Sequence, residues 1–253
     1  MSRIAEQAVN PGARPSGEAT EQAAAEHVRQ IFDSIAPSYD LLNHLLSMGL
    51  DRRWWNRAAR SFRDILARPN ARVLDLCCGT GDMTSALLKQ RPQSAEPVTG
   101  LDFSAEMLER ARTKYTGANA IWVQGDAMHL PYADDSFDLV TAAFGFRNLT
   151  NYAAGLAEIH RVLAPNGRIG ILECNQPDGL SGFGYGIYFQ HVLPLLGGLI
   201  SGDRAAYKYL PESVARFPRP TQMLKMMAEA GFTESTWDGY LLRAAGLYRG
   251  MKV

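Results

Sequence analysis

Short apolar runs and helical stretches alternate through the middle of this chain, and this alternation limits its fold more than any other feature. Apolar runs occur at 72–76, 97–102, 121–123, 137–143 and 168–173, with helical spacing between several of them. Strands and helices that alternate in this way predict parallel βαβ units, with helices on both faces of one sheet. The sequence therefore predicts an α/β fold with a doubly wound, mostly parallel sheet.

The two flanks add a helical cap and the edge of the sheet. Apolar residues recur at helical spacing from about Ala23 to Ile35, and a second helical segment runs from Leu41 towards Phe62. The C-terminal flank predicts a helix over Thr221–Glu229, then strands over Thr233–Trp237 and Leu241–Arg249. These two strands bring the sheet to seven.

A length of 253 residues fits one such domain with embellishments. We expect a flexible tail over 1–22, because prolines and glycines are frequent there. The domain itself covers 23–253. Its expected parts are a helical cap over 23–68, a cofactor-binding core over 71–175, an apolar lid or insert over 176–220, and a C-terminal helix with strands over 221–253.

Composition excludes several other classes of protein. The chain has 26 Lys and Arg against 26 Asp and Glu, so it lacks the basic balance that a nucleic-acid partner usually requires. Cys77, Cys78 and Cys174 show neither a disulfide framework nor the spacing of zinc ligands. The first 26 residues contain no apolar segment of a secretion signal. We expect a cytoplasmic protein without a metal.

A glycine turn after the first predicted strand indicates a nucleoside site. Gly79 and Gly81 follow this strand, and Asp102 ends the next one about 20 residues later. Glycines allow the backbone to approach a ligand closely, and a carboxylate at the second strand can accept hydrogen bonds from both ribose hydroxyls. Such sites lie at the carboxyl ends of the strands.

The residues after the turn favour S-adenosylmethionine over a dinucleotide. The dinucleotide fingerprint has a third glycine where Thr84 stands, and Asp82 at the start of the following helix would repel a pyrophosphate. A cationic sulfonium tolerates this carboxylate. Asp126, followed by Ala127, offers a further carboxylate for the adenine amino group. A nicotinamide oxidoreductase stays open as the second enzyme hypothesis.

Simpler interpretations remain for several of these residues. A Gly-x-Gly pair is weak by itself in a chain with 23 glycines, and Asp126 could merely cap the turn before Leu130. Cys77 and Cys78 fit small buried side chains better than nucleophiles. None of the five histidines makes a convincing base, although His129 precedes Leu130 in a loop near the expected cofactor.

The chain resembles the class I methyltransferases and, more narrowly, the ubiquinone/menaquinone biosynthesis C-methyltransferase family. The resemblance extends from about Val28 to Lys252. Tyr39–Asp40 combined with Gly145-x-Arg147–Asn148 is specific to this group, whereas the glycine loop is shared more widely. The segments that carry the resemblance are Phe32–Asp40, Leu74–Asp82, Gly125–Met128, Phe144–Asn148 and Arg161–Gly167.

The resemblance implies S-adenosylmethionine as cofactor and a polyprenylated quinol as substrate, with the ring carbon of a demethylmenaquinol as the methyl acceptor. A ubiquinol precursor remains an alternative acceptor. The positions that match the family's cofactor site are Gly79, Thr80, Gly81, Asp102, Asp126 and Ala127. The chain departs from the family at Ala143, Asn175 and Arg243, and we expect the last two near the acceptor pocket.

Four residues are candidates for the chemistry. A ring carbon becomes nucleophilic when its neighbouring hydroxyl ionises, and Arg147 is the candidate cation for the resulting phenolate. Asn148 would orient a water molecule or the hydroxyl, and Tyr39 and Asp40 would close over the ring and exclude water. Alternatively, Arg147 only pairs with an acid such as Asp138, and Tyr39–Asp40 only fixes a helix junction.

The apolar segment between the fifth strand and the C-terminal strands suggests how a polyprenyl tail is held. We expect a glycine-hinged lid over Gly182–Gly198 that contacts the tail and the inner surface of the membrane. A core or dimer-interface helix is the alternative, so a homodimer stays open. A non-catalytic scaffold that binds the cofactor within a quinone-synthesis assembly is the remaining hypothesis for function.

Overall fold

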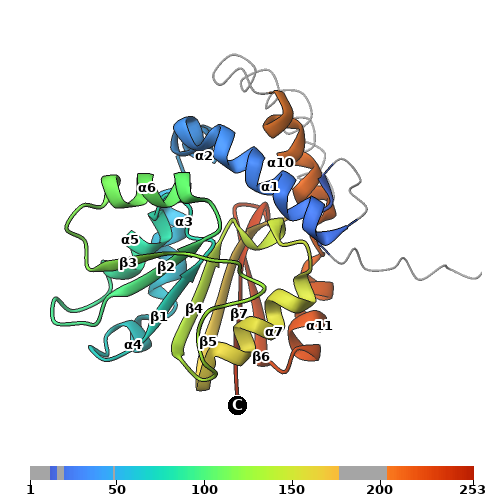
Figure 1. Cartoon of the computed structure of the whole chain (residues 1–253). Coiled ribbons are helices and arrows are strands. Elements are labelled where there is room, and N and C mark those ends of the chain that lie inside the picture. Colours follow the sequence, from blue (N-terminus) through green and yellow to red (C-terminus); the bar gives the residue numbers. More distant parts are fainter. Residues whose placement is uncertain (1–11, 16–19, 48, 177–203) are drawn as a thin grey trace, which may run out of the picture.

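The computed structural model describes residues 12–15, 20–47, 49–176 and 204–253 (Figure 1). They contain one seven-stranded sheet with the order β3-β2-β1-β4-β5-β7-β6, in which only the pairings of β7 are antiparallel. This confirms the predicted doubly wound sheet. The strands are β1 Val73–Leu76, β2 Val98–Asp102, β3 Ala120–Gln124, β4 Phe137–Ala143, β5 Leu163–Cys174, β6 Thr233–Tyr240 and β7 Ala245–Met251.

The sheet changes direction at β1, and this point locates the ligand site. All four residues of β1 are buried, and Val73 pairs with Val98 of β2 on one side and with Leu139 of β4 on the other. Chain connections leave β1 and β4 in opposite directions across the sheet. A crevice therefore opens beyond the carboxyl ends of these strands, where ligands of doubly wound sheets bind.

Helices cover both faces of the sheet, as Figure 1 shows for α7 and α11 on one face. Their apolar side chains pack on the sheet with Tyr248 and Ile171, whereas α3, α4 and α5 pack on the opposite face with Val98 and Leu247. The helices are α1 Glu21–Ile35, α2 Tyr39–Leu46, α3 Asp51–Arg60, α4 Arg63–Leu66, α5 Asp82–Leu88, α6 Ala105–Lys114, α7 Tyr152–Val162, α10 Arg204–Arg216 and α11 Pro220–Glu229. Two 3-10 turns are η2 Ala36–Ser38 and η3 Phe146–Asn148.

The cap lies across the carboxyl ends of the strands (Figure 1). Helix α1 begins where the Thr20 hydroxyl accepts a hydrogen bond from the Ala23 amide. It buries Val28, Ile31 and Ile35 against Tyr209 of α10. A helical cap on the sheet is thus confirmed. Within the described residues, no helix is long and apolar enough to cross a bilayer.

Two predicted elements have different bounds in the structure. The single helix expected over 41–62 is divided into α2 and α3, because the chain turns at Gly49 with a φ of 73°. The last strand begins at Ala245 instead of Leu241. Leu241, Leu242 and Arg243 form a tight turn with φ values of 38°, 51° and 72°, which are incompatible with a strand.

Residues 12–15 are packed, although they fall in the segment expected to be a flexible tail. Ala13 is 1% exposed, and its amide donates to the Leu149 carbonyl at 2.7 Å. The Arg14 guanidinium donates to the Thr150 carbonyl at 2.8 Å. The expected tail therefore includes a short stretch that covers the loop after η3.

Candidate functional site

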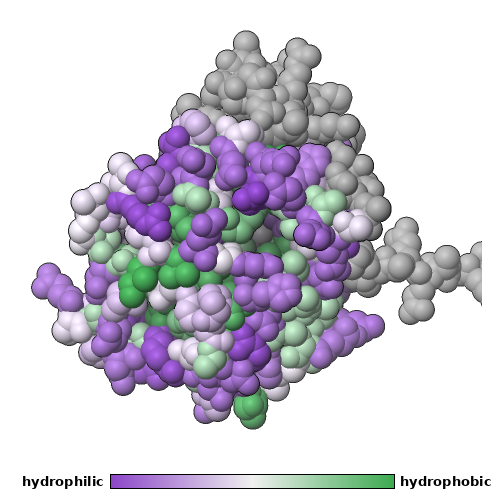
Figure 2. Space-filling model, viewed as in Figure 1, coloured by the Kyte–Doolittle hydropathy of each residue, from purple (hydrophilic) through white to green (hydrophobic). Residues whose placement is uncertain are grey.

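A cavity of about 600 Å³ lies between the sheet and α1, beyond the carboxyl ends of β1, β2, β3 and β4. This volume is in the range of small-molecule sites, which is roughly 300–1,000 Å³. Figure 2 shows hydrophobic residues in the hollow of this face, beneath the polar side chains of α1. The cavity joins two regions: one at the glycine loop, Asp102 and Asp126, and one at Tyr39, Phe144 and Asn148.

The glycine loop contributes one of its three predicted residues to the cavity. Gly79 lines it, with a φ of 53°. Gly81 has a φ of 88°, and a Cβ there would lie 2.6 Å from the Trp122 ring, so glycine is required for the backbone conformation and for space. Thr80 and Gly81 are not among the lining residues. They shape the loop and leave the contact to Gly79.

Asp102 faces the cavity from the end of β2. Its Oδ2 accepts from the Gly79 amide at 2.8 Å and its Oδ1 from the Ser104 amide at 2.9 Å. Only 4% of the residue is exposed, and this desolvation raises the pKa of its carboxyl to about 6. Because Asp102 lines the cavity, its carboxylate can accept from a ribose hydroxyl while it holds the glycine loop.

Asp126 and Ala127 line the cavity from the loop after β3. Asp126 also has the simpler role considered from the sequence, because its Oδ1 accepts from the Met128 amide at 2.9 Å and caps the turn. Its Oδ2 lies 2.8 Å from Nδ1 of His129. This hydrogen bond raises the pKa of His129, whose side chain is 81% exposed and does not line the cavity.

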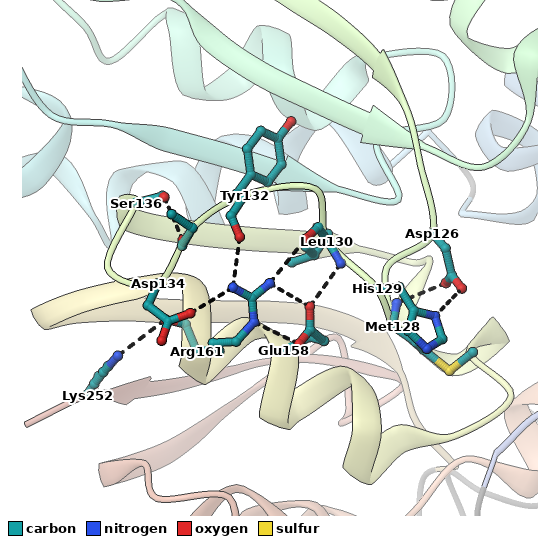
Figure 3. A network of polar contacts seen from close by, with 11 residues as sticks. Asp126, Met128, His129, Leu130, Tyr132, Asp134, Ser136, Glu158, Arg161 and Lys252 are labelled. Atoms are coloured by element: carbon teal, nitrogen blue, oxygen red, sulfur yellow. Dashed lines mark hydrogen bonds and ion pairs between the residues drawn. The ribbon is translucent and has the colours of Figure 1, made fainter.

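The loop that carries Asp126 is fixed by an arginine of α7, as Figure 3 shows. The Arg161 guanidinium donates to the Tyr132 carbonyl at 2.7 Å and to the Leu130 carbonyl at 3.1 Å. Glu158, one turn earlier, pairs with Arg161 at 2.8 Å and accepts from the Leu130 amide at 2.9 Å. Arg161 belongs to the segment Arg161–Gly167 that carries the family resemblance, but its position in the sequence does not indicate this role.

Tyr39 lines the cavity but Asp40 does not. The Tyr39 ring lies near Gly79, and desolvation raises the pKa of its hydroxyl to about 12, so it stays protonated. Asp40 accepts from the Thr80 hydroxyl at 2.5 Å and from Lys114 Nζ at 2.7 Å. It therefore ties α2 to the glycine loop and to α6.

Lys114 also bonds Asp82, at 2.9 Å. Asp82 lines a second, polar cavity of about 320 Å³ behind the glycine loop rather than the main cavity. Its carboxylate still occupies the N-terminus of α5, where a dinucleotide would place its pyrophosphate. No sequence pattern indicates Lys114, which lies 74 residues from Asp40.

Asn148 lines the cavity, and Arg147 beside it does not. Arg147 is 6% exposed and pairs with Glu173 at 3.1 Å, so the alternative partner considered from the sequence, Asp138, is wrong. Asp138 contacts Arg72 instead. Burial opposes the charge of Arg147, but the attraction of Glu173 outweighs it, and the pKa of the guanidinium is raised above its usual value.

Two residues expected near the acceptor pocket are not among the described residues that line this cavity. Asn175 is 4% exposed and does not line the cavity; its Oδ1 accepts from the Tyr248 hydroxyl at 2.5 Å. Arg243 lies in the β6–β7 turn, 5.1 Å from the centre of the Trp237 ring. The apolar lid expected over Gly182–Gly198 lies outside the described residues.

The donor set of the cavity fits S-adenosylmethionine. A buried carboxylate faces the ribose position, Leu101, Phe103 and Met107 provide apolar walls, and Gly79 permits close approach of the backbone. A dinucleotide fits less well because Asp82 stands where its phosphates would bind. Among the described residues, no group of three or more His, Cys, Asp and Glu side chains could hold a metal ion.

Comparison with known proteins agrees with this geometry. Residues 20–252 match the family model of the ubiE/COQ5 methyltransferase family. The chain is 46% identical to a demethylmenaquinone methyltransferase of Deinococcus radiodurans over 236 residues, which cover 92% of this chain and 95% of the relative. It is 50% identical to a demethylmenaquinone methyltransferase of Thermus thermophilus over 207 residues, covering 80% and 91%.

A solved structure shares the fold at low sequence identity. The [4+2]-cyclase SpnF superposes with a TM-score of 0.64 at 19% identity, covering 95% of this chain and 98% of that chain. That protein is a cyclase, so the likeness concerns the fold and not the reaction.

Proposed function

Because the chain belongs to the ubiE/COQ5 methyltransferase family, we propose that it transfers the methyl group of S-adenosylmethionine to a ring carbon of a demethylmenaquinol in quinone biosynthesis. The observation that carries this proposal is the continuous cavity. One end offers a buried carboxylate and a glycine for the adenosine, and the other end places the Asn148 carboxamide and the Tyr39 ring beside the apolar side chains of Phe32, Phe144 and Leu149. A flat, apolar ring with oxygen substituents suits the second end.

When bound, S-adenosylmethionine supplies an electrophilic methyl group. In the cofactor region, Gly79, Asp102, Asp126 and Ala127 bind the donor, while Thr80 and Gly81 hold the loop in shape. The main contribution of these residues is orientation, because a methyl group aligned with the ring carbon removes much of the entropic cost of a reaction between two molecules.

In the acceptor region, Asn148 contacts a ring oxygen. Ionisation of the quinol hydroxyl places negative charge on this oxygen and makes the ring carbon nucleophilic, and an N–H donor facing the oxygen favours the ionised form. Tyr39 covers the ring and excludes water from it, since its ring lies between α1 and Gly79. After methyl transfer, a water molecule takes the proton of the ring carbon, which restores aromaticity.

Arg147 and Asp40 act from behind the cavity as positioning residues. The charge of Arg147 is neutralised by Glu173, and its guanidinium donates to the Phe144 carbonyl. This fixes the segment that carries Phe144 and Asn148, both of which line the cavity. Asp40 holds α2 against the glycine loop and so places Tyr39, its neighbour in the chain.

The polyprenyl tail of the substrate leaves the cavity beneath α1, where Val28, Phe32 and Leu149 line it together with polar side chains of this helix, Gln22, Glu26 and Arg29. A substrate with such a tail resides in a bilayer, so this proposal includes contact with the inner surface of the membrane by a cytoplasmic protein. The expected lid over 182–198 and a homodimer are compatible with this arrangement.

Transfer of a labelled methyl group from S-adenosylmethionine tests the function. Demethylmenaquinol and a demethylated benzoquinol precursor of ubiquinol are offered in parallel to the whole chain. We expect label on the naphthol ring; label on both rings would make the enzyme common to two pathways. Binding of S-adenosylmethionine without label on either ring would contradict the proposal and support a non-catalytic scaffold.

A further inference from the structure

Helix α10 reaches the acceptor region through the hydroxyl group of Tyr209. The Tyr209 hydroxyl donates to Oδ1 of Asn148 at 3.0 Å, across 61 positions of the sequence. Tyr209 is 5% exposed and Asn148 is 9% exposed, so water does not readily replace either partner in this hydrogen bond. A buried hydrogen bond of this kind holds the asparagine side chain in one orientation.

This orientation decides what Asn148 offers to a ligand. A carboxamide has an acceptor on one side and two donor hydrogens on the other. Tyr209 occupies Oδ1, and the described residues provide no hydrogen-bond partner for Nδ2. Because Asn148 lines the cavity, the group left for a ligand is an N–H donor. Burial raises the pKa of Tyr209 to about 12, so its hydroxyl keeps the proton that it donates.

The position of Tyr209 depends in turn on the cap. Its ring packs with Val28, Ile31 and Ile35 of α1. The next turn of α10 brings Ser213 to Arg147, the neighbour of Asn148 in η3. The Ser213 hydroxyl accepts from Nε of Arg147 at 3.3 Å. Helix α10 therefore contacts both Arg147 and Asn148, and the ring of Tyr209 links this contact to α1.

We propose that Tyr209 is a positioning residue that turns the Asn148 amide so that Nδ2 donates to a ring oxygen of the acceptor. Recognition of that oxygen thereby depends on the packing of α1 against α10. This inference rests on the proposed function, because it assumes an acceptor ring that carries an oxygen. Tyr209 thus contributes to specificity for an oxygenated ring, although it does not itself line the cavity.

The chain contains a matched pair that serves as a control. The Tyr248 hydroxyl donates to Oδ1 of Asn175 at 2.5 Å, both residues are buried, and neither lines the cavity. Tyr248→Phe thus removes the same kind of hydrogen bond elsewhere in the fold. Any loss of stability common to buried tyrosines is present in both variants.

The test compares Tyr209→Phe and Tyr248→Phe in methyl transfer to a demethylmenaquinol with a two-unit prenyl tail. We expect Tyr209→Phe to lower kcat/KM for the quinol about tenfold, the equivalent of one hydrogen bond of about 1.4 kcal/mol, with little change in the Kd of S-adenosylmethionine. Tyr248→Phe should change both by less than about twofold. In an Asn148→Ala background, Tyr209→Phe should have no further effect on kcat/KM.

A second measurement is independent of turnover. The side-chain amide of Asn148 gives a ¹⁵N resonance that is identified by its loss in Asn148→Ala. Relaxation of this resonance should report a rigid amide in the parent and in Tyr248→Phe, and a mobile amide in Tyr209→Phe. A rigid amide in Tyr209→Phe would overturn the inference, as would equal losses of kcat/KM in the two tyrosine variants. If the parent enzyme methylates no quinol while the amide becomes mobile, the proposed function fails and the positioning by Tyr209 stands.

Discussion

The two halves of the cavity are held together in different ways. In the cofactor half, Gly79 follows β1 and Asp102 ends the adjacent strand β2, and the Gly79 amide donates a hydrogen bond to the Asp102 carboxylate. In the acceptor half, Tyr39 and Asn148 are held through side chains of distant helices, including Tyr209. The cofactor half is thus a product of the sheet, whereas the acceptor half forms only when the cap is docked.

This difference separates two kinds of requirement on the sequence. A site built at strand ends needs a few residues at fixed spacing, since parallel strands bring their carboxyl ends together. A site built by docking helices needs matched pairs far apart in the chain, such as Lys114 with Asp40. Changes in the cap should therefore affect acceptor turnover first and binding of S-adenosylmethionine second.

The largest expected effect concerns the buried ion pair of the acceptor half. Arg147→Met leaves Glu173, which is 0% exposed, without its counter-charge, and should lower the free energy of unfolding by about 3–5 kcal/mol. Urea unfolding measures this loss. Arg168→Met is the control, because Arg168 pairs with Asp64 at the surface and should contribute about 0–1 kcal/mol.

The double variant Arg147→Met/Glu173→Gln tests the cause. It removes both charges. The Arg147 amide donates to Oε1 of Glu173 at 3.1 Å and the Cys174 amide to Oε2 at 3.0 Å, so the single oxygen of the glutamine keeps an acceptor for one of these two amides. The double variant should regain more than half of the lost stability. A single variant as stable as the parent would mean that Glu173 is not held by Arg147, and the acceptor half would lose its strongest internal link.

Sequence reasoning located the cofactor half because its signals are local. Asp102 and Gly79 were found from a turn and a strand end, and the structure places both in the cavity. Arg147 and Asp40 were assigned to the acceptor half from motifs, but these could not show which way each side chain points. Neither residue lines the cavity, because Glu173 and Lys114 hold them behind it.

Motifs also do not show which distant residue will be the hydrogen-bond partner of a given side chain. Tyr209 meets Asn148 across 61 positions, and the fold of the cap, not the spacing of residues, brings them together. The helix break at Gly49 and the turn at Leu241 were also missed. Both turns need positive φ values. Glycine usually marks such a turn in a sequence, but Leu241 stands at this one.

In the cofactor half, an effect of intermediate size is expected on the Kd of S-adenosylmethionine, which should depend on the protonation of Asp102. The pKa of Asp102 is raised to about 6, so the carboxyl is ionised at pH 7.5 and takes up a proton as the pH falls through 6. A protonated carboxyl loses acceptor sites for ribose hydroxyls. Calorimetry should show the Kd of S-adenosylmethionine rising by up to about tenfold per pH unit below pH 6.

Asp102→Asn is the matched variant for this profile. It should bind S-adenosylmethionine about 30-fold more weakly at pH 7.5, because hydrogen bonds to a charged acceptor are lost, and its Kd should not vary with pH. Asp33→Asn, which removes a carboxylate that accepts from the Ser104 hydroxyl, should keep the pH dependence. A profile that survives in Asp102→Asn would instead belong to buried Asp75, whose pKa is raised to about 7 by desolvation.

The smallest effect tests whether the two halves are separable. Lys114 joins Asp40 of the cap to Asp82 of α5, but its side chain is 31% exposed, so the link contributes little. Lys114→Met should raise the KM of the quinol about threefold, change the Kd of S-adenosylmethionine by less than about twofold, and reduce the sensitivity of that KM to salt. Arg112→Met, on the same helix, should leave all three unchanged. Because Asp40 also bonds Thr80 of the glycine loop, an equal rise of both constants in Lys114→Met would mean that the cap and the cofactor loop move as one unit, and the contrast between the two halves would fail.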